Sequence, residues 1–221
     1  MIKAVLLDLD GTLIDTAADM ATALNNLLQE EGQAPLPLEQ VRPFVSQGGL
    51  VLTRLGFPGM SDEQQIESMR QRYLQHYFAI VADQSKLFDG FETILNELEQ
   101  RGLDWGIVTN KPEWLTRPLL RQLQLLERAG VVICGDTLAR RKPDPLPLIV
   151  AAERLQLSSR DCIYVGDDER DIVAGKAAEM KTLAAAYGYI QPGTDIQSWR
   201  ANAIIDHPLD LLNHLSNESL T

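Results

Sequence analysis

Two aspartates, Asp8 and Asp10, directly follow the apolar run Ala4–Leu7 near the start of the chain. Four apolar residues that give way to glycine and polar residues are typical of a buried strand. Residues two apart on a strand point to the same side, so we expect both carboxylates near one point. Two carboxylates held together repel, so one takes a proton or both share a cation. One can then act as a nucleophile and the other as an acid and base.

Three further polar segments could join this pair. They are, in chain order, Thr109-Asn110-Lys111, Arg141–Pro145 and Gly166–Asp171. The first and the third each follow a short apolar run, and the second precedes a helical pattern. If the strands are parallel, these segments lie at the same edge as Asp8 and bring carboxylates, a hydroxyl and a lysine together. Taken singly, Thr109 is typical of a hydroxyl in a turn, and Lys142 is typical of a surface lysine. Only their predicted position at the same edge as Asp8 makes them candidate site residues.

The elements that must position these residues alternate along the second half of the chain. The predicted strands are Ala4–Leu7, Trp105–Val108, Val131–Cys134, Cys162–Val165 and Leu183–Ala186. Apolar residues at helical spacing predict helices through Phe91–Leu98, Leu115–Leu123, Leu148–Leu155 and Ile172–Ala177. Short apolar strands that alternate with helices form a parallel sheet with helices on both faces. We therefore expect an α/β fold whose ligands bind at the carboxyl ends of the strands.

Residues 16–84 show no strand pattern. Apolar residues from Met20 to Leu28 recur at helical spacing and predict an amphipathic helix over residues 16–31, which ends at Gly32. Further helical patterns continue to about residue 83. We therefore predict a small helical subdomain at 16–84, inserted into a larger domain made of residues 1–15 and 85–221.

Composition narrows the class of protein. Apolar residues make up 45% of the 221 residues, which is enough for a real core. The 31 acidic residues outnumber the 20 basic ones, and a net charge of −11 disfavours nucleic acid or an anionic membrane as partner. Cys134 and Cys162 lie in apolar runs and predict reduced core thiols. We see no signal peptide and no membrane span, and therefore expect a cytoplasmic protein.

The polar motifs, in their order along the chain, resemble those of phosphatases in the haloacid dehalogenase superfamily, especially phosphoglycolate phosphatases. The matching motifs are Asp8–Thr12, Val108-Thr109-Asn110, Lys142-Pro143 and Gly166–Asp171. The match extends over essentially the whole chain. The resemblance implies a Rossmann-like, three-layer core with a helical cap inserted after the first motif, where residues 16–84 stand. It also implies a phosphoric monoester hydrolase whose partner is a small phosphorylated metabolite.

The same resemblance implies roles for the motif residues. Asp8 is expected to be the nucleophile that forms an aspartyl-phosphate. Asp10 is expected to protonate the leaving alkoxide and then to deprotonate the water that hydrolyses the intermediate. Thr109 and the amide of Asn110 are expected to bind a phosphoryl oxygen. Lys142 is expected to offset charge on Asp8 and on the phosphate together.

A magnesium ion completes the implied site. Its expected protein ligands are the Asp8 carboxylate, the Asp10 main-chain carbonyl and Asp167, since Mg²⁺ prefers oxygen donors. Asp171 is expected to orient metal-bound waters or Lys142. The family commonly has serine or threonine where Asp168 stands, so we interpret Asp168 as a helix cap and leave it out of the metal site.

Other functions stay open, because a fold does not fix a function. Haloacid dehalogenases share the nucleophile but need neither the second aspartate nor the metal-binding carboxylates, so Asp10, Asp167 and Asp171 argue against that reaction. Phosphotransferases of the beta-phosphoglucomutase kind keep the same core residues and differ in the cap. A non-catalytic binding protein is expected to have lost the nucleophile or a metal ligand, and this chain has lost neither.

The substrate depends on the cap and on the end of the chain. The segments Val45–Gly49, Ala186–Ile190 and Trp199–Ala203 resemble a proteobacterial branch of phosphoglycolate phosphatases. Some members of that branch act on N-acetylmuramic acid 6-phosphate, so both substrates are hypotheses. Arg42, as an anion ligand, and Ser46 are the candidate specificity contacts in the cap. The sequence leaves open whether the protein is a monomer or a homodimer.

Overall fold

The computed structural model of the chain describes residues 1–215, so the last six residues of the predicted core lie outside the described part. Six parallel strands form one sheet in the order β5-β4-β1-β6-β7-β8. They are β1 (Ala4–Leu7), β4 (Asp104–Val108), β5 (Val131–Ile133), β6 (Cys162–Gly166), β7 (Lys181–Ala185) and β8 (Ala203–Ile205). The five predicted strands are confirmed. The sequence pattern does not predict β8, since it has only three residues and Ile204 in its middle is exposed.

Helices cover both faces of this sheet. The long ones are α5 (Phe91–Gln100), α6 (Glu113–Gln122), α7 (Leu146–Arg154) and α8 (Glu169–Ala177). The short 3-10 turns are η2 (Ser159–Asp161), η3 (Ile196–Trp199) and η4 (Pro208–His214). Val5 and Leu7 of β1 pack with α5 and α6, whereas Ala4 and Leu6 pack with α7 and α8. Successive strand residues point to opposite faces, so β1 is buried on both sides and the predicted three-layer α/β core is confirmed.

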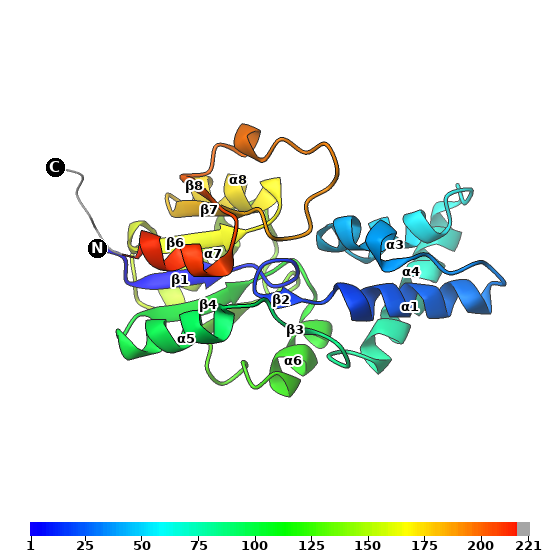
Figure 1. Ribbon diagram of the computed structural model, residues 1–221, viewed down its shortest axis with the longest axis horizontal. Coiled ribbons are helices and arrows are strands. Elements are labelled where there is room, and N and C mark those ends of the chain that lie inside the picture. Colours follow the sequence, from blue (N-terminus) through cyan, green and yellow to red (C-terminus); the bar gives the residue numbers. More distant parts are fainter. Residues whose placement is uncertain (216–221) are drawn as a thin grey trace.

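A helical insert follows the first strand. Its elements are α1 (Ala17–Glu30), α2 (Leu38–Val41), the 3-10 helix η1 (Arg42–Gln47), α3 (Gly49–Gly56) and α4 (Glu63–Ala79). We call these five elements the cap. Figure 1 shows α1, α3 and α4 grouped at one end of the molecule, beyond the edge of the sheet. No strand occurs within described residues 17–79, which confirms the prediction of an all-helical insert.

Two short strands join the cap to the core. β2 (Ile14–Asp15) and β3 (Lys86–Leu87) pair in antiparallel fashion, with Asp15 opposite Lys86. The chain therefore leaves the core and returns to it side by side (Figure 1). Asp19, buried at the start of α1, accepts the main-chain N–H groups of Gln84 and Ser85, both at 2.9 Å. These bonds tie the two crossings to each other.

Candidate active site

The carboxyl ends of three neighbouring strands meet in the middle of the sheet. Leu7 of β1 pairs with Ile107 of β4 on one side and with Val165 of β6 on the other. Asp8 follows Leu7, and its main-chain N–H donates to the Val165 carbonyl at 2.9 Å. Asp8 is therefore central at this edge, and the polar segments that follow β4 and β6 flank it, as the parallel pattern predicts.

A buried lysine joins the carboxylates at this edge. Nζ of Lys142 lies 2.8 Å from Oδ1 of Asp8 and 2.7 Å from Oδ1 of Asp171. It also donates to the Val108 carbonyl at 2.9 Å and to the Tyr164 hydroxyl at 2.7 Å. Burial opposes the charge of Lys142, but the two carboxylates outweigh burial and raise the pKa of the ammonium above its ordinary value. A charged group is thus held beside Asp8.

Two neighbours hold Lys142 in this position. The side chain of Asn110 donates to the main-chain carbonyl of Lys142 at 2.9 Å and accepts its N–H at 3.1 Å, so it ties the loop after β5 to the end of β4. Tyr164 of β6 is fully buried, and its hydroxyl lies within hydrogen-bond distance of Lys142 and Val108. Sequence reasoning missed Tyr164, because it stands inside an apolar run with no polar neighbour to mark it.

Three buried carboxylates converge beside Lys142. Asp8, Asp167 and Asp171 can each offer an oxygen atom within 4.8 Å of the others. Burial raises the pKa of Asp167 well above its ordinary range, and the charges of Asp8 and Asp171 add to the shift. Burial also raises the pKa of Asp171 to about 6, with Lys142 opposing the shift. One ammonium cannot balance three carboxylates, so the cluster favours a second cation, and its oxygen donors suit Mg²⁺.

The cap reaches this cluster through Ser46 of η1. Its Oγ lies 2.7 Å from Oδ2 of Asp167 and 3.2 Å from the main-chain carbonyl oxygen of Asp10. The same Asp167 oxygen accepts the N–H of Tyr189 at 2.9 Å. Gly11 packs against these groups with φ of +82°, and a Cβ there would lie 2.1 Å from Asp167 Oδ2. Only glycine fits at this point of the first motif. The absence of a side chain lets the backbone of Gly11 lie close to Asp167.

The carboxylate of Asp10 has a different set of partners. Its Oδ1 and Oδ2 lie 2.9 and 3.1 Å from Nζ of Lys111, and the Thr16 hydroxyl donates to Oδ1 at 2.7 Å. Lys111 also donates to the hydroxyl of Tyr77, on α4 of the cap, at 2.9 Å. Sequence reasoning gave neither Lys111 nor Tyr77 a role. The place of Lys111 directly after the second motif could have marked it, whereas Tyr77 is only one of several large residues at helical spacing.

Two other candidates are held in local ion pairs. The guanidinium of Arg42 makes two 3.0 Å bonds to the Asp15 carboxylate and lies 4.9 Å from the centroid of the Tyr189 ring. Burial opposes ionisation of Asp15, but hydrogen bonds from Arg42 and Tyr189 outweigh it and lower the pKa of this carboxyl. Asp168 is the N-cap of α8 and pairs with Arg170, which confirms its interpretation as a helix cap. Both guanidinium groups are therefore already engaged by carboxylates.

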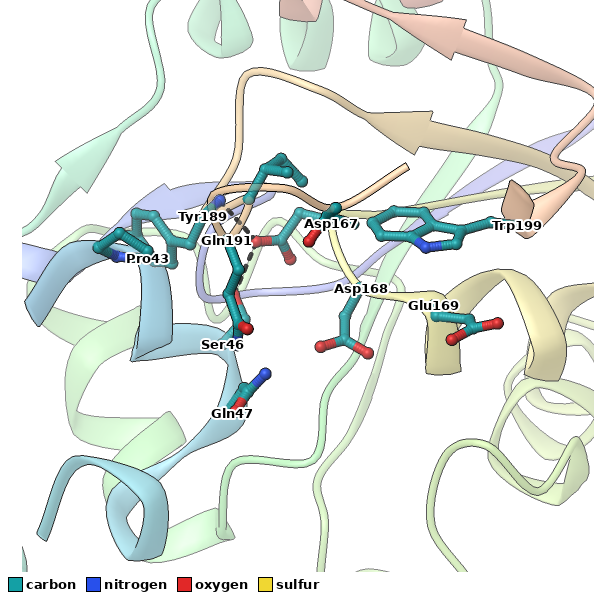
Figure 2. Close-up of a pocket in the computed structure, with 11 residues that line it drawn as sticks. Pro43, Ser46, Gln47, Asp167, Asp168, Glu169, Tyr189, Gln191 and Trp199 are labelled. Atoms are coloured by element: carbon teal, nitrogen blue, oxygen red, sulfur yellow. Dashed lines mark hydrogen bonds between the residues drawn. The ribbon is translucent and has the colours of Figure 1, made fainter. Parts of the chain in front are cut away.

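A cavity of about 170 Å³ opens beside Asp167 (Figure 2). Its walls come from η1 in the cap, from the start of α8 and from the loop between β7 and η3. The polar and aromatic lining residues besides Asp167 are Ser46, Gln47, Asp168, Glu169, Tyr189, Gln191, Thr194 and Trp199. The side chains that line it include no lysine or arginine in the described part of the chain. The cavity thus offers carboxylates, amides and aromatic rings to a ligand.

The edge of the sheet thus holds a carboxylate that could act as a nucleophile, a buried cation beside it and an oxygen-rich cluster that could hold a second cation. These are the parts that transfer of a phosphoryl group requires, because that reaction depends on in-line attack and on neutralisation of charged oxygens. The helices within residues 1–215 include none that is long and apolar enough to cross a membrane.

Comparison with known proteins agrees with this geometry. Residues 5–185 match the profile of the family described as haloacid dehalogenase-like hydrolase. The chain is 46% identical to a phosphoglycolate phosphatase of Xanthomonas campestris over 209 residues, 95% of this chain and 94% of the other. It is 38% identical to the N-acetylmuramic acid 6-phosphate phosphatase of Pseudomonas aeruginosa, over 97% and 95%. A crystal structure of a predicted phosphoglycolate phosphatase from Haemophilus somnus superposes with a TM-score of 0.86 at 23% identity, over 97% and 98%. The chain belongs to the haloacid dehalogenase-like hydrolase family.

Proposed function

We propose that this chain is a Mg²⁺-dependent phosphatase that hydrolyses a small phosphate monoester through an aspartyl-phosphate on Asp8. The observation that carries the proposal is the position of Asp8, held 2.8 Å from the buried ammonium of Lys142 at the end of β1. A phosphoryl group attached to Asp8 would lie within reach of that charge. Lys142 would thus offset negative charge in every step in which the phosphoryl group moves.

The reaction divides into two transfers. In the first, an Asp8 oxygen bonds to phosphorus, the ester P–O bond breaks, and Asp10 gives a proton to the departing alkoxide. In the second, water attacks phosphorus and gives its proton to Asp10, and the bond between phosphorus and the Asp8 oxygen breaks to release inorganic phosphate. Thr109 and the main-chain amide of Asn110 would bind a phosphoryl oxygen during both transfers.

The acidic cluster is where the metal would bind. Asp8, the carbonyl of Asp10 and Asp167 are the proposed ligands, and Asp171 would act on the site through Lys142, which it contacts at 2.7 Å. Bound Mg²⁺ would supply positive charge against the phosphate oxygens. The Ser46 hydroxyl lies against two of the proposed ligand oxygens, so the cap borders the metal site directly.

Phosphoglycolate is the first candidate substrate. The support is the 46% identity over 95% of the chain to a relative with that name.

We also propose that residues 16–84 move as a cap on a core of residues 1–15 and 85–221, closing over this substrate to exclude water. The buried free thiols of Cys134 and Cys162 support a cytoplasmic location.

N-acetylmuramic acid 6-phosphate is the second candidate, and one observation favours it. The cavity beside Asp167 lacks a lysine or arginine within the described lining, and it carries amide, carboxylate and aromatic groups. Such groups can hydrogen-bond the hydroxyls of a sugar and pack against its ring. Both candidates carry a carboxylate, and neither carboxylate would find a free guanidinium there, because Arg42 and Arg170 are engaged by Asp15 and Asp168. The candidates differ in that only the sugar has a ring and several hydroxyls for the lining groups to bind.

The test is phosphate release from a panel of monoesters that includes both candidates, with Mg²⁺ and with excess chelator. We expect turnover with Mg²⁺, none with chelator, and recovery when Mg²⁺ is restored. Ca²⁺ should substitute poorly, since it takes a looser shell with more ligands. Full activity in excess chelator would contradict the metal assignment. The ratio of kcat/KM for the two named esters decides between the candidate substrates.

A further inference from the structure

We propose that Lys111 is a positioning residue for Asp10 and that Tyr77 fixes Lys111, so that the cap controls where the acid–base carboxylate stands. The proposal rests on the proposed function, because it takes Asp10 as the group that moves protons. It adds a link from the cap to the chemistry that does not pass through the substrate.

The main chain of Lys111 is anchored in the core. Its N–H donates to the Thr109 hydroxyl at 3.1 Å, and its carbonyl accepts from the Gly135 N–H at 2.9 Å and from the Thr116 hydroxyl at 3.3 Å. Only 4% of its side chain is exposed. The anchored main chain and the burial of the side chain therefore restrict the positions that the ammonium can occupy. A group that positions another side chain requires this restriction.

The end of the Lys111 side chain bridges the core and the cap. Its Nζ lies 2.9 and 3.1 Å from the two oxygens of Asp10 and 2.9 Å from the hydroxyl of Tyr77. The same Nζ stands 4.4 Å from the centroid of the Tyr77 ring, so the aromatic face also attracts it. Tyr77 is fully buried near the end of α4. If α4 moves, Lys111 loses both contacts with the cap at once.

Unlike Asp8, Asp10 is held by groups that contact or border the cap. Its second partner is Thr16, which directly precedes α1 and donates to Oδ1 at 2.7 Å. Asp8 is held by Lys142, whose partners all belong to the core. Movement of the cap would therefore shift the groups around Asp10 and leave those around Asp8 in place. A misplacement of about 1 Å at a reacting group can cost ~10²-fold in rate.

A purely structural counter-ion would behave differently. Loss of such an ion pair lowers the stability of the protein and lowers the turnover rate of every substrate to a similar extent. A misplaced Asp10 slows only the steps that need its proton transfer. An alkyl leaving group needs the proton, whereas a nitrophenolate leaves without it, and both substrates need Asp10 again when water attacks. The leaving group therefore separates the two roles.

The experiment compares Lys111→Met, Lys111→Arg, Tyr77→Phe and the matched control Tyr73→Phe by rapid-mixing kinetics. Tyr73 lies one helical turn before Tyr77, and its hydroxyl has no hydrogen-bond partner in residues 1–215. The substrates are p-nitrophenyl phosphate and an alkyl phosphate that the parent chain hydrolyses. Thermal melting of each variant reports folding.

With p-nitrophenyl phosphate, Lys111→Met should release one equivalent of nitrophenolate quickly and then turn over ~10²-fold more slowly than the parent. With the alkyl ester it should show no burst, because the first step is slow as well. Tyr77→Phe should show the same pattern with a smaller loss, and Lys111→Arg should recover part of the rate. Tyr73→Phe should keep the parent's ratio of first-step rates for the aryl and alkyl esters.

Equal slowing of both substrates by Lys111→Met without a burst, or parent rates on both, would overturn the proposal. If Lys111→Met does not fold, the comparison of Tyr77→Phe with Tyr73→Phe decides, and identical aryl-to-alkyl ratios of the first-step rate in these two variants would overturn the proposal. A parent chain that releases no phosphate from any ester would overturn the proposed function and this inference together. An active parent with unaffected variants would overturn this inference alone.

Discussion

The core and the cap contact the charged groups of the candidate site in different ways. Lys142 meets Asp8, Asp171, Val108 and Tyr164, all of them from the sheet or from α8. The cap contributes single hydroxyl groups, from Ser46 to Asp167 and from Tyr77 to Lys111. One hydrogen bond contributes about 1 kcal/mol net, whereas breaking a buried ion pair costs about 3–5 kcal/mol. The comparison indicates that the core keeps its geometry while the contacts from the cap can be exchanged.

At the outer part of the boundary between cap and core, the contact between the two units is also only partly buried. Phe78 of α4 packs against Trp114 of α6 with ring centroids 5.4 Å apart. Both side chains remain partly exposed, at 48% and 43%. Half-exposed aromatic contacts lose less apolar burial on separation than core contacts do. Separation of cap and core at this point is therefore cheaper than disruption of either unit.

The strongest way to test the role of the core is Asp8→Asn. The amide cannot attack phosphorus, and loss of a nucleophile costs several orders of magnitude, so we expect turnover to fall by more than ~10³-fold for every ester. The fold should persist, which the far-UV spectrum and the melting temperature check. Asp161→Asn, on the surface ion pair with Lys3, is the matched control and should keep the parent rate. A tenth of the parent rate in Asp8→Asn would contradict the nucleophile assignment.

Lys142→Ala should have the next largest effect. It leaves the buried carboxylates of Asp8 and Asp171 without their cation, which we expect to destabilise the fold by about 3–5 kcal/mol. It should also slow all substrates by a similar factor, because Lys142 belongs to the core. The measurements are kcat/KM over the ester panel and the free energy of unfolding. Lys3→Ala, which removes an exposed ion pair, is the control. A loss confined to one substrate class would place Lys142 with the specificity contacts instead.

The sequence predicted the candidate residues of the core better than the contacts of the cap, for a physical reason. A buried parallel strand leaves a dense apolar run, and its polar end is marked within one residue, as Leu7 and Asp8 show. The catalytic candidates of the core could therefore be placed from pattern and resemblance. Contacts from the cap depend on how helices dock, and docking leaves no local signal. Lys111 and Tyr77, 34 residues apart, could not be paired from the sequence, and Arg42 was expected as an anion ligand although it pairs with Asp15 in the structure.

A smaller effect is expected from two tyrosines on one face of α4. Tyr73 is fully buried, and its hydroxyl has no hydrogen-bond partner among the described residues. An unpaired buried hydroxyl costs roughly 1–3 kcal/mol, so Tyr73→Phe should stabilise the protein by about 1 kcal/mol. Tyr77→Phe removes a hydrogen-bond partner of Lys111 and should destabilise the protein by a similar amount. Denaturant unfolding of both variants checks the opposite signs. A loss of stability in Tyr73→Phe would mean that this hydroxyl has a partner.

The smallest effect should come from Arg42→Met at the junction of cap and core. Arg42 and Asp15 are both partly exposed, with 35% and 23% of their side chains accessible, so the pair contributes at most ~1 kcal/mol. The pKa of Asp15 is lowered in the folded protein. A lowered carboxyl pKa contributes stability above the unfolded value near 4, and that contribution is lost as the pH falls through the folded pKa. The difference in melting temperature between parent and Arg42→Met should therefore be present at pH 7 and shrink below about pH 4.

The ester panel tests Arg42 in its other predicted role. If Arg42 serves only the junction, Arg42→Met should leave the relative rates of phosphoglycolate and sugar phosphates unchanged. Ser46→Ala should change them, because Ser46 lines the cavity beside Asp167. If Arg42→Met selectively weakens esters that carry a carboxylate, the guanidinium must leave Asp15 when such a substrate binds. The ion pair would then be a contact of the unliganded cap, exchanged for the substrate on closure. That outcome would sharpen the contrast with Lys142, whose partners in the structure all belong to the core.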